Sequence, residues 1–297
     1  MDISFCIVTY HARDMLRDCL RSLQQNPPAC AFEVVVIDNH SQDGVGEMLT
    51  QEFPQVIFLE ENENAGYTRP MNRALRTTTG RYRVQLNADT LVQPGCFDQL
   101  YEFMQSHPLV GICTPRVLNL DGTLQKQCRR SAARPWDVIS YFTGLSRLFP
   151  RSSFFSRYLQ TFHPEDETHP VEAVSGSCMM IRQEVLQQIG YLDEQFFAYQ
   201  EDTDFCVRAG QAGWQIYYVP QARIIHYGGQ SGSAVHPYLG VYQWHRSYYL
   251  YYRKNLARGY FFLFNWLYYG LMGGKLLFAL AVTFLRKEKI VGTPKPR

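Results

Sequence analysis

The sequence has almost no excess of charge of either sign. Its 297 residues include 29 lysines and arginines and 27 aspartates and glutamates, for a formal net charge of +2. A nucleic-acid partner is therefore not indicated. The eight cysteines form no CxxC pair, and most of them fall inside apolar segments. That scatter is typical of reduced, buried cysteines in a cytosolic protein.

The sequence also lacks internal repeats, low-complexity tracts, and a charged leader or small-residue cleavage site before its first apolar segment. We therefore expect no signal peptide. The overall composition, 46% hydrophobic and 19% charged, is that of a folded protein. A chain of this length buries a sizeable core, either as one large domain or as two fused halves.

Short apolar segments alternate with helical patterns over the first 90 residues. Buried strands are expected at 3–9, 32–37, 56–59 and 82–86, and helices at 13–25, 43–52 and 66–78. This alternation predicts right-handed βαβ units and a parallel sheet covered on both faces. Ligands bind beyond the carboxyl ends of such strands, which is where Thr9, Asp38 and Asp89 lie.

The second part of the chain is less regular. A helix is expected up to Ser106, and a strand at 110–118. Residues 134–168 are the least patterned, which indicates a variable lid or an acceptor loop. Beyond them we expect strands at 179–181, 215–219 and 222–226, and helices at 183–190, 202–211 and 238–257.

Two acidic residues at strand ends are candidates for a nucleotide site. The Asp38 carboxylate is placed to accept the imide N–H of a uracil or thymine ring, or else to cap the helix that begins near Asp43. The Asn87-Ala88-Asp89 sequence is placed to hold Mg²⁺ or Mn²⁺ on a diphosphate, since hard cations take oxygen ligands. The alternative for Asp89 is a turn residue that accepts backbone N–H groups.

Three acids, Glu201, Asp202 and Asp204, open the helix expected at 202–211. One acid at a helix N-terminus is explained by capping. Three exceed that need, and their repulsion raises the pKa of at least one unless a cation lies nearby. His226 ends the next strand and is either a further divalent-metal ligand or a structural histidine.

Taken together, these segments resemble the family 2 glycosyltransferases, and more closely their bacterial rhamnosyltransferase-like branch. The matching segments cover about 230 residues in the family's order: IVTYH (7–11), VVVIDNHSQDG (34–44), NENAGYTRPMNRAL (62–75), LNAD (86–89), VGICTPRVLNLDGTLQ (110–125) and the run 171–231. The resemblance implies a GT-A fold, in which a Rossmann-like nucleotide half is fused to an acceptor half around a mixed central sheet. It also implies inverting transfer from a nucleotide-diphosphate sugar with a divalent cation.

Site residues follow from the same resemblance. Thr9, Tyr10 and Asp38 are expected to contact the pyrimidine nucleotide, and Gly66 and Asn72 to shape the nucleoside pocket. A carboxylate in reach of the acceptor hydroxyl is needed as general base.

The resemblance assigns that base to Asp202 of the ED motif, with Glu201 as its neighbour. Asp89 matches the metal-binding last position of the family's DxD motif, and His226 matches a third metal position. The first position of that motif is Asn87 here, which is expected to contact ribose and adds no charge. Metal binding should therefore depend more on Asp89 and His226.

An apolar stretch, residues 260–285, lies near the C-terminus. Its length suffices for a transmembrane helix, which needs about 20 residues. Lys275 lies inside it, at a cost of roughly 2.5–3.5 kcal/mol at the centre of a spanning helix. Gly273 and Gly274 are expected to break the stretch into two pieces too short to span.

Basic residues flank this stretch on both sides: Arg253, Lys254, Arg258, Arg286, Lys287 and Lys289. We therefore expect a helical hairpin that lies in the membrane interface over residues 253–289, on the cytoplasmic face. The alternatives are helices packed on the enzyme's own core and a true span.

The expected organisation is a catalytic domain over 1–235, divided into a nucleotide-sugar half (1–118) and an acceptor half (119–235), followed by a helical segment over 236–297. The expected function is metal-dependent transfer from a dTDP- or UDP-sugar, such as a rhamnose donor, to a glycan or lipid-linked acceptor of a surface polysaccharide. A nucleotidyltransferase and a catalytically inactive nucleotide-sugar-binding scaffold remain as alternatives.

Overall fold

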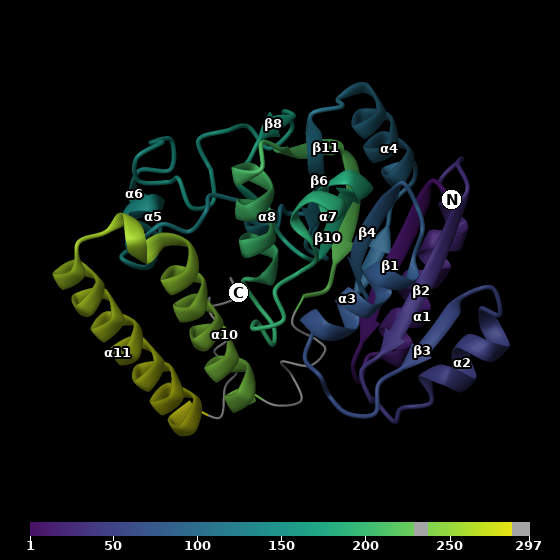
Figure 1. Cartoon of the computed structure of the whole chain (residues 1–297), viewed down its shortest axis with the longest axis horizontal. Helices are drawn as coiled ribbons and strands as arrows, with labels where there is room; N and C mark the ends of the chain where they lie inside the picture. Colours follow the sequence, from purple (N-terminus) through teal and green to yellow (C-terminus); the bar gives the residue numbers. More distant parts are fainter. Residues whose placement is uncertain (229–236, 287–297) are drawn as a thin grey trace.

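One mixed sheet forms the centre of the computed structural model, which describes residues 1–228 and 237–286 (Figure 1). Over these residues the sheet has nine strands in the order β3-β2-β1-β4-β10-β6-β11-β5, with β8 paired to β11. Its parallel part consists of β1 Ile3–Thr9, β2 Phe32–Asp38, β3 Ile57–Glu60 and β4 Tyr82–Asn87. The α/β class and the mixed sheet are confirmed.

Helices alternate with these strands as the periodicity predicts. They are α1 Arg13–Gln25, α2 Val45–Glu52, α3 Thr68–Thr77 and α4 Cys96–Ser106. In α1 the residues Leu16, Cys19, Leu20 and Leu23 are buried, a spacing that places them on one helix face. Burial of such a stripe fixes each helix on the sheet, and the strand ends are left free for a site.

A strand from the second part of the chain is inserted into the sheet of the first. This strand, β10 Cys178–Arg182, lies antiparallel between β4 and β6 Val110–Leu118. Its terminal Arg182 is 4% exposed and donates to the carbonyl oxygens of Met104 and Val110, at 2.6 and 2.9 Å. The shared sheet therefore places the ends of β4 and the segment before β10 next to each other.

One long strand, β11 Gln215–His226, replaces the two short strands expected at 215–219 and 222–226. It pairs parallel with β6, with a register shift between Val219 and Arg223, and its last residues pair antiparallel with β5 Thr90–Val92. Pro220 lies within the shift and has no N–H for the ladder. The proline interrupts the pairing but does not end the strand. A short strand, β8 His169–Pro170, pairs with β11 on the other side.

The segment 134–168, expected as a lid or acceptor loop, contains the helices α5 Pro135–Phe142 and α6 Leu145–Leu148. Pro135 occupies the first turn of α5, a position that suits its fixed φ and missing N–H. A two-stranded sheet, β7 Arg129–Arg130 with β9 Ala173–Val174, closes the base of this segment. It is preceded by a 3₁₀ turn, Lys126–Cys128.

The C-terminal part forms two antiparallel helices, α10 Pro237–Tyr251 and α11 Phe262–Arg286, which lie side by side in Figure 1. A π-helical turn, Tyr252–Leu256, and a 3₁₀ turn, Ala257–Gly259, join them. The expected break at Gly273-Gly274 was wrong, since α11 continues through both residues. Glycine weakens a helix but keeps both backbone hydrogen-bonding groups, so a helix that is packed along its length continues through it.

The inner faces of these helices form a second hydrophobic cluster with α5. Its buried members are Ala133, Val138, Phe196, Tyr248, Tyr251, Tyr252 and Tyr268. Lys275 faces the same side: its Nζ lies 4.0 Å from the Trp244 ring centroid and 3.1 Å from His245 Nε2. The one charged residue inside the apolar stretch therefore points toward the protein, which leaves the opposite face of α11 uninterrupted.

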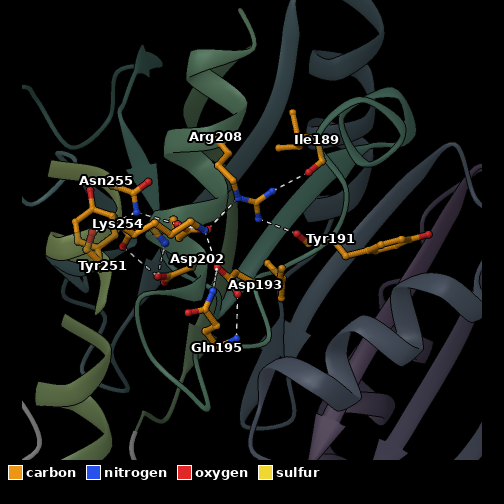
Figure 2. Close-up of polar contacts among 12 residues, drawn as sticks. Ile189, Tyr191, Asp193, Gln195, Asp202, Arg208, Tyr251, Lys254 and Asn255 are labelled. Carbon is orange, nitrogen blue, oxygen red and sulfur yellow. Dashed lines mark hydrogen bonds and ion pairs between the residues drawn. The ribbon is translucent and has the colours of Figure 1, made fainter. Parts of the chain in front are cut away.

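A buried carboxylate fastens the C-terminal segment to α8 Glu201–Gln211. Asp204 is fully buried and accepts from Arg208 Nε at 2.9 Å, Lys254 Nζ at 2.8 Å and Asn255 Nδ2 at 2.8 Å. Figure 2 shows Lys254 and Asn255 converging with Arg208 at this point. Arg208 also donates to the carbonyl oxygens of Ile189, at the end of α7 Gln183–Ile189, and Tyr191. Both oxygens of the Asp204 carboxylate are thus engaged in contacts that hold the C-terminal segment.

We predict that Asp204→Ala lowers the free energy of unfolding by about 1–3 kcal/mol, because it removes the buried acceptor that Arg208, Lys254 and Asn255 share. The loss is limited because Arg208 keeps two carbonyl acceptors and Lys254 keeps Asp193. Chemical denaturation of the full chain measures this. Asp14→Ala is the control, since Asp14 pairs with Arg17 at the surface with 71% of its side chain exposed, where an ion pair contributes little to stability. Equal losses in the two variants would show that Asp204 does not fasten the C-terminal segment.

Candidate active site

A cleft of about 340 Å³ opens at the carboxyl ends of β1 and β4. Its lining joins residues that are far apart in the sequence: Val8, Tyr10, Asn39, Asn64, Gly66, Tyr67, Asn87, Ala88, Asp89, Ser175, Gly176, Ser177, Phe197, Ala198, Tyr199, His226, Leu239, Gly240 and Gln243. Five of the expected site residues are among them: Tyr10, Gly66, Asn87, Asp89 and His226. The cleft is therefore the candidate active site, and α10 supplies part of its wall.

Asp89 and His226 meet on one side of this cleft. The pairing of β5 with β11 sets His226 opposite Thr90, and the Tyr227 N–H donates to the Asp89 carbonyl oxygen at 2.9 Å. His226 Nε2 lies 3.1 Å from Asp89 Oδ1. Burial opposes the charged form of Asp89, but the hydrogen bond and charge of His226 outweigh it, and the pKa of Asp89 falls below its ordinary value.

Gln125 orients the imidazole ring of His226. The Gln125 amide nitrogen donates to the His226 carbonyl oxygen at 2.6 Å, so its oxygen, 2.9 Å from Nδ1, is the acceptor. Nδ1 therefore carries a proton, and Nε2 faces Asp89 and the cleft. With a second proton Nε2 donates to Asp89 Oδ1, and without it the Nε2 lone pair is available to a cation. A second partner that fixes the tautomer in this way is typical of a metal-binding histidine. No feature of the neighbouring residues marks Gln125, which lies 101 residues before His226.

Asn87 links this pair to the nucleotide half of the sheet. Its Nδ2 lies 3.3 Å from His226 Nε2, and its Oδ1 accepts from the Tyr67 hydroxyl at 3.1 Å. Gln85, two residues earlier on β4, donates to the Gly176 carbonyl oxygen at 3.1 Å. A polar connection therefore runs under the cleft from His226 to the loop before β10. Tyr67 and Gln85 were missed from the sequence.

The donor set at this position fits a divalent cation. It consists of one carboxylate oxygen and one neutral imidazole nitrogen, a combination that suits Mn²⁺ better than Mg²⁺. Among residues 1–228 and 237–286, no group of three or more His, Cys, Asp or Glu side chains is arranged to hold a metal. A cation held by Asp89 and His226 would therefore take its remaining ligands from substrate oxygens and water.

The residues expected around the nucleotide base lie at different depths. Tyr10 and Gly66 line the cleft, whereas Thr9 and Asp38 are 1% and 2% exposed and lie behind its surface. Asp38 accepts from the Ser41 N–H at 3.0 Å and from the Ser41 hydroxyl, and burial raises its pKa. Its carboxylate holds the turn after β2, and it does not cap α2.

Asn39, which the sequence reasoning missed, shapes the loop before α3. Its side chain donates to the Gly66 carbonyl oxygen at 2.7 Å and to Asn64 Oδ1 at 2.9 Å, and it accepts from the Ala65 N–H. Gly66 has φ +81°, and a Cβ there would lie 2.3 Å from the Phe197 carbonyl oxygen. Only glycine fits this close approach, which brings the loop of one half against that of the other.

Asn72 lies outside the cleft. It is fully buried in α3 and holds the chain that follows α7: its Nδ2 donates to the Leu192 carbonyl oxygen at 2.9 Å and its Oδ1 accepts from the Leu192 N–H at 3.0 Å. Nδ2 also donates to Glu194 Oε1 at 2.9 Å. Any effect of Asn72 on the nucleoside pocket is therefore indirect, through the position of the 192–197 loop.

Glu201 and Asp202 begin α8 directly behind the cleft wall. The preceding residues, Tyr199 and Gln200, both have left-handed backbone conformations, with φ of 67° and 65°. This turn directs the N-terminus of α8 toward the loop 175–177, which lines the cleft. Two successive non-glycine residues in this conformation are costly, and such strain concentrates at functional sites.

Asp202 has charged and neutral hydrogen-bond donors on both oxygens. Its Oδ2 accepts from Arg130 Nη2 at 2.7 Å and from the Gly176 N–H at 3.0 Å. Its Oδ1 accepts from the N–H and the hydroxyl of Thr203. Arg130, another residue missed from the sequence, also donates to the Val174 carbonyl oxygen at 3.1 Å. The arrangement holds Asp202 as a carboxylate of fixed orientation next to the cleft-lining Gly176.

The environment of Glu201 differs from that of Asp202. It is 5% exposed, and its Oε2 has no hydrogen-bond partner among the described residues. Burial, and then the negative charge of Asp202, raise the pKa of Glu201 to about 8. A carboxyl group with a raised pKa beside a carboxylate that is paired with an arginine is a common acid–base arrangement.

Comparison with known proteins identifies the family. Residues 2–261 match the model of the family described as "Glycosyltransferase like family 2". A curated relative is the N-acetylglucosaminyl-diphospho-decaprenol L-rhamnosyltransferase of Mycobacterium tuberculosis, with 29% identity over 209 residues. That match covers 67% of this chain and 67% of the relative.

Solved structures share the fold. S. aureus TarS 1–349 in complex with UDP-GlcNAc superposes with a TM-score of 0.57 and 15% identity, over 86% of this chain and 67% of that one. The mannosyltransferase PcManGT from Pyrobaculum calidifontis, in complex with GDP-Man and Mn²⁺, gives a TM-score of 0.56 and 17% identity, over 85% and 63%. The chain has the GT-A fold and belongs to the family 2 glycosyltransferases.

Proposed function

We propose that the chain is an inverting glycosyltransferase that moves a sugar from a dTDP- or UDP-sugar to a hydroxyl group of a glycan or lipid-linked acceptor, in cell-surface polysaccharide synthesis. The observation that carries the proposal is the cleft itself. It has the Asp89–His226 pair on one side and, behind Gly176 on the other, the Asp202 carboxylate. Similarity to the Mycobacterium tuberculosis L-rhamnosyltransferase favours rhamnose as the sugar and a diphospho-lipid as the acceptor.

In the proposed reaction Asp202 is the general base. The acceptor hydroxyl transfers its proton to a carboxylate oxygen of Asp202 while its own oxygen attacks the anomeric carbon. The bond from that carbon to the diphosphate breaks on the opposite side, so the configuration inverts. Positioning of the base is the role of Arg130 and Gly176, which hold Oδ2 at 2.7 and 3.0 Å.

Asp89 and His226 are the residues that would hold Mn²⁺ or Mg²⁺. A bound cation would offset the negative charge that develops on the leaving nucleoside diphosphate. Asn87 adds no charge to this site, and its amide is already shared between Tyr67 and His226. Its role is to keep the His226 ring at the correct distance from β4.

Two other functions explain less of the site. A nucleotidyltransferase has no use for the Asp202–Arg130 arrangement in the second half of the chain. An inactive nucleotide-sugar-binding scaffold is compatible with Asn87 at the first DxD position, but it does not require a strained turn that directs two carboxyls to the cleft wall. Transfer or donor hydrolysis in the presence of Mn²⁺, compared with binding alone, separates these functions.

We also propose that the protein lies on the cytoplasmic face of the cell membrane through α11. This helix is long and apolar enough to cross a membrane by length and composition, and 17% of its most apolar window is buried. Its outward face carries large apolar side chains that are more than half exposed: Phe262, Leu263, Trp266, Leu267, Leu271, Leu277, Phe278, Phe284 and Leu285.

A helix that packs on α10 along one face and exposes such side chains along the other suits a position in the plane of the interface. Lys275 does not oppose this position, because it points inward. Of the expected basic flank, Lys287 and Lys289 lie outside the described residues. α11 therefore combines two of the expected arrangements: one face packs on the protein's second hydrophobic cluster, and the other face is apolar and uncovered.

Asp202→Asn should lower kcat by about 10²–10⁴-fold, because it removes the basicity of the side chain. It also takes an acceptor from Arg130 and Gly176 or from Thr203, so a smaller loss of donor affinity is expected beside it. Steady-state turnover and donor calorimetry measure the two quantities. Asp18→Asn, at an exposed position of α1, serves as the control. A variant that retained more than a tenth of wild-type turnover would move the base to another residue, and Glu201 would be the next candidate.

Asp89→Ala should abolish most of the gain in donor affinity that Mn²⁺ provides, and His226→Ala should reduce it less. The double variant should lose little more than Asp89→Ala alone, because both residues act through one cation. Donor titration with and without Mn²⁺ measures the gain. If Asp89→Ala kept the full gain, the assignment of the metal site would be wrong.

Glu201→Gln should remove a pH dependence of stability. The pKa of Glu201 is raised from 4.5 to about 8, so over this interval the unfolded chain binds fewer protons than the folded protein. The free energy of unfolding of the wild type should therefore fall as pH rises from 5 to 8, relative to Glu201→Gln. Thermal melts at several pH values, with the exposed Glu47→Gln as control, test this. Parallel curves for all three proteins would contradict it.

Substitution of the outward face of α11 should release the protein from membranes. Leu267→Glu combined with Leu271→Glu should lower binding to anionic vesicles by at least about tenfold, because burial of one leucine side chain is worth roughly 1.5–3 kcal/mol. The control carries Ile57→Glu, in β3, and Leu109→Glu, just before β6, which are 41% and 65% exposed. Unchanged sedimentation of the α11 variant with vesicles would rule out this membrane face.

A further inference from the structure

A second exposed apolar surface lies outside both the cleft and α11. It is the tip formed by residues 145–155, at α6 and the loop that follows it. Leu148, Phe149 and Phe154 are 72%, 49% and 61% exposed there. Large apolar side chains that cluster on an exposed surface often mark a site of contact with another protein or a membrane, whereas single exposed ones do not.

The tip is held in this exposed arrangement by buried hydrogen bonds. The Ser156 hydroxyl, which is buried, lies 2.7 Å from the Phe149 carbonyl oxygen and 3.1 Å from that of Ser146. The Ser140 hydroxyl donates to the Phe155 carbonyl oxygen at 2.6 Å. These bonds fix the backbone on both sides of the exposed side chains.

The aromatic rings are fixed as well. The Trp136 indole N–H donates to the Phe154 carbonyl oxygen at 3.1 Å, and the Trp136 and Phe154 ring centroids lie 5.1 Å apart. Phe155 stacks on Phe149 at 5.0 Å. These contacts therefore hold Phe149 and Phe154 in their outward-facing positions.

Positive charge is interleaved with these apolar side chains. Arg147 and Arg151 lie on either side of Leu148 and Phe149 in the sequence, and no carboxylate of the described part of the chain lies within ion-pair distance of either. Arg147 also lines a cavity of about 990 Å³ together with Arg116 and Lys126, opposite a single acid, Glu165. The surroundings of the tip therefore carry an uncompensated positive charge.

The tip is on the same side of the molecule as α11. In Figure 1 the helices α5 and α6 lie at the end where α10 and α11 are joined, far from α2 and β3. Val138 and Ile139 of α5 pack in the cluster that contains Tyr248 and Tyr268. Phe142, at the end of α5, lies 4.5 Å from Lys275 Nζ of α11. The tip and α11 are thus parts of one packed unit.

We propose that the tip at residues 145–155 is a second membrane contact, which inserts Leu148, Phe149 and Phe154 among lipids and pairs Arg147 and Arg151 with anionic headgroups. Apolar and aromatic side chains beside unpaired arginines are the composition that binds an anionic lipid surface. Two contacts, the tip and α11, would fix the orientation of the protein on the membrane. The inference rests on the membrane association proposed above and does not depend on sugar transfer.

Vesicle sedimentation of the full chain tests the proposal. In one variant Leu148→Glu is combined with Phe154→Glu, and in another Arg147→Gln is combined with Arg151→Gln, so that each changes the net charge by the same amount. The first should bind vesicles of phosphatidylcholine and phosphatidylglycerol about tenfold more weakly than the wild type. The second should lose a similar factor on these vesicles and little on vesicles of phosphatidylcholine alone, because its effect is electrostatic.

The variant with Ile57→Glu and Leu109→Glu is the control for added surface charge, and far-ultraviolet circular dichroism checks folding. If both tip variants bound vesicles as strongly as the wild type while the α11 variant bound more weakly, the proposed membrane contact at the tip would be overturned. The contact through α11 would stand. No binding by the wild type would overturn both contacts. If the control also bound vesicles more weakly than the wild type, the loss would be due to net charge, and the proposed contact at the tip would be overturned.

A milder substitution covers the case in which the glutamate variants do not fold. Phe154→Trp keeps the apolar surface and adds a fluorophore at the tip. It should show more quenching by brominated phospholipid than the wild type, and the added part should respond to phosphatidylglycerol content. The absence of any added quenching would overturn the proposal.

Discussion

The pairing of β5 with the end of β11 is the constraint on which the site depends. It sets His226 opposite Thr90 and fixes the distance of 3.1 Å between Nε2 and Asp89 Oδ1. Gln125 then selects the ring tautomer, and Asn87 connects the pair to Tyr67. A register slip of one residue would turn the imidazole to the other face of the sheet. Backbone hydrogen bonds, rather than a metal, therefore assemble the two candidate ligands.

The second constraint is electrostatic and concerns the start of α8. Three carboxyl groups lie at a largely buried helix end, and the cost of burying each is met in a different way. Asp202 has Arg130 at 2.7 Å, Asp204 has Arg208 and Lys254, and Glu201 has no cationic partner, so its pKa rises to about 8. Because Asp204 also holds Lys254 and Asn255, the helix that carries the proposed base is attached to the segment that carries α11.

Features set by local periodicity could be predicted from the sequence: the alternation of strands and helices, and the acidic residues at strand ends such as Asp89. Features that depend on contacts between residues far apart in the sequence could not be predicted. Arg130, Gln125 and Asn39 act through partners that only the folded chain brings near, and nothing in their neighbouring residues marks them. Gly273 was over-weighted as a helix breaker, since packing of α11 on α10 outweighs its low propensity. Asn72, assigned to the nucleoside pocket by resemblance, instead holds the Leu192 backbone.

The most direct test of this account is the anomeric configuration of the product. The chain would be incubated with Mn²⁺, a panel of dTDP- and UDP-sugars, and a short-chain lipid-linked diphospho-sugar as acceptor. The new glycosidic bond would then be assigned by NMR. Displacement by an acceptor hydroxyl, activated by one carboxylate across the cleft, predicts a configuration opposite to that of the donor. Retention of the donor configuration would contradict it, because retention requires a covalent intermediate or a same-side attack that this arrangement of carboxylates does not provide.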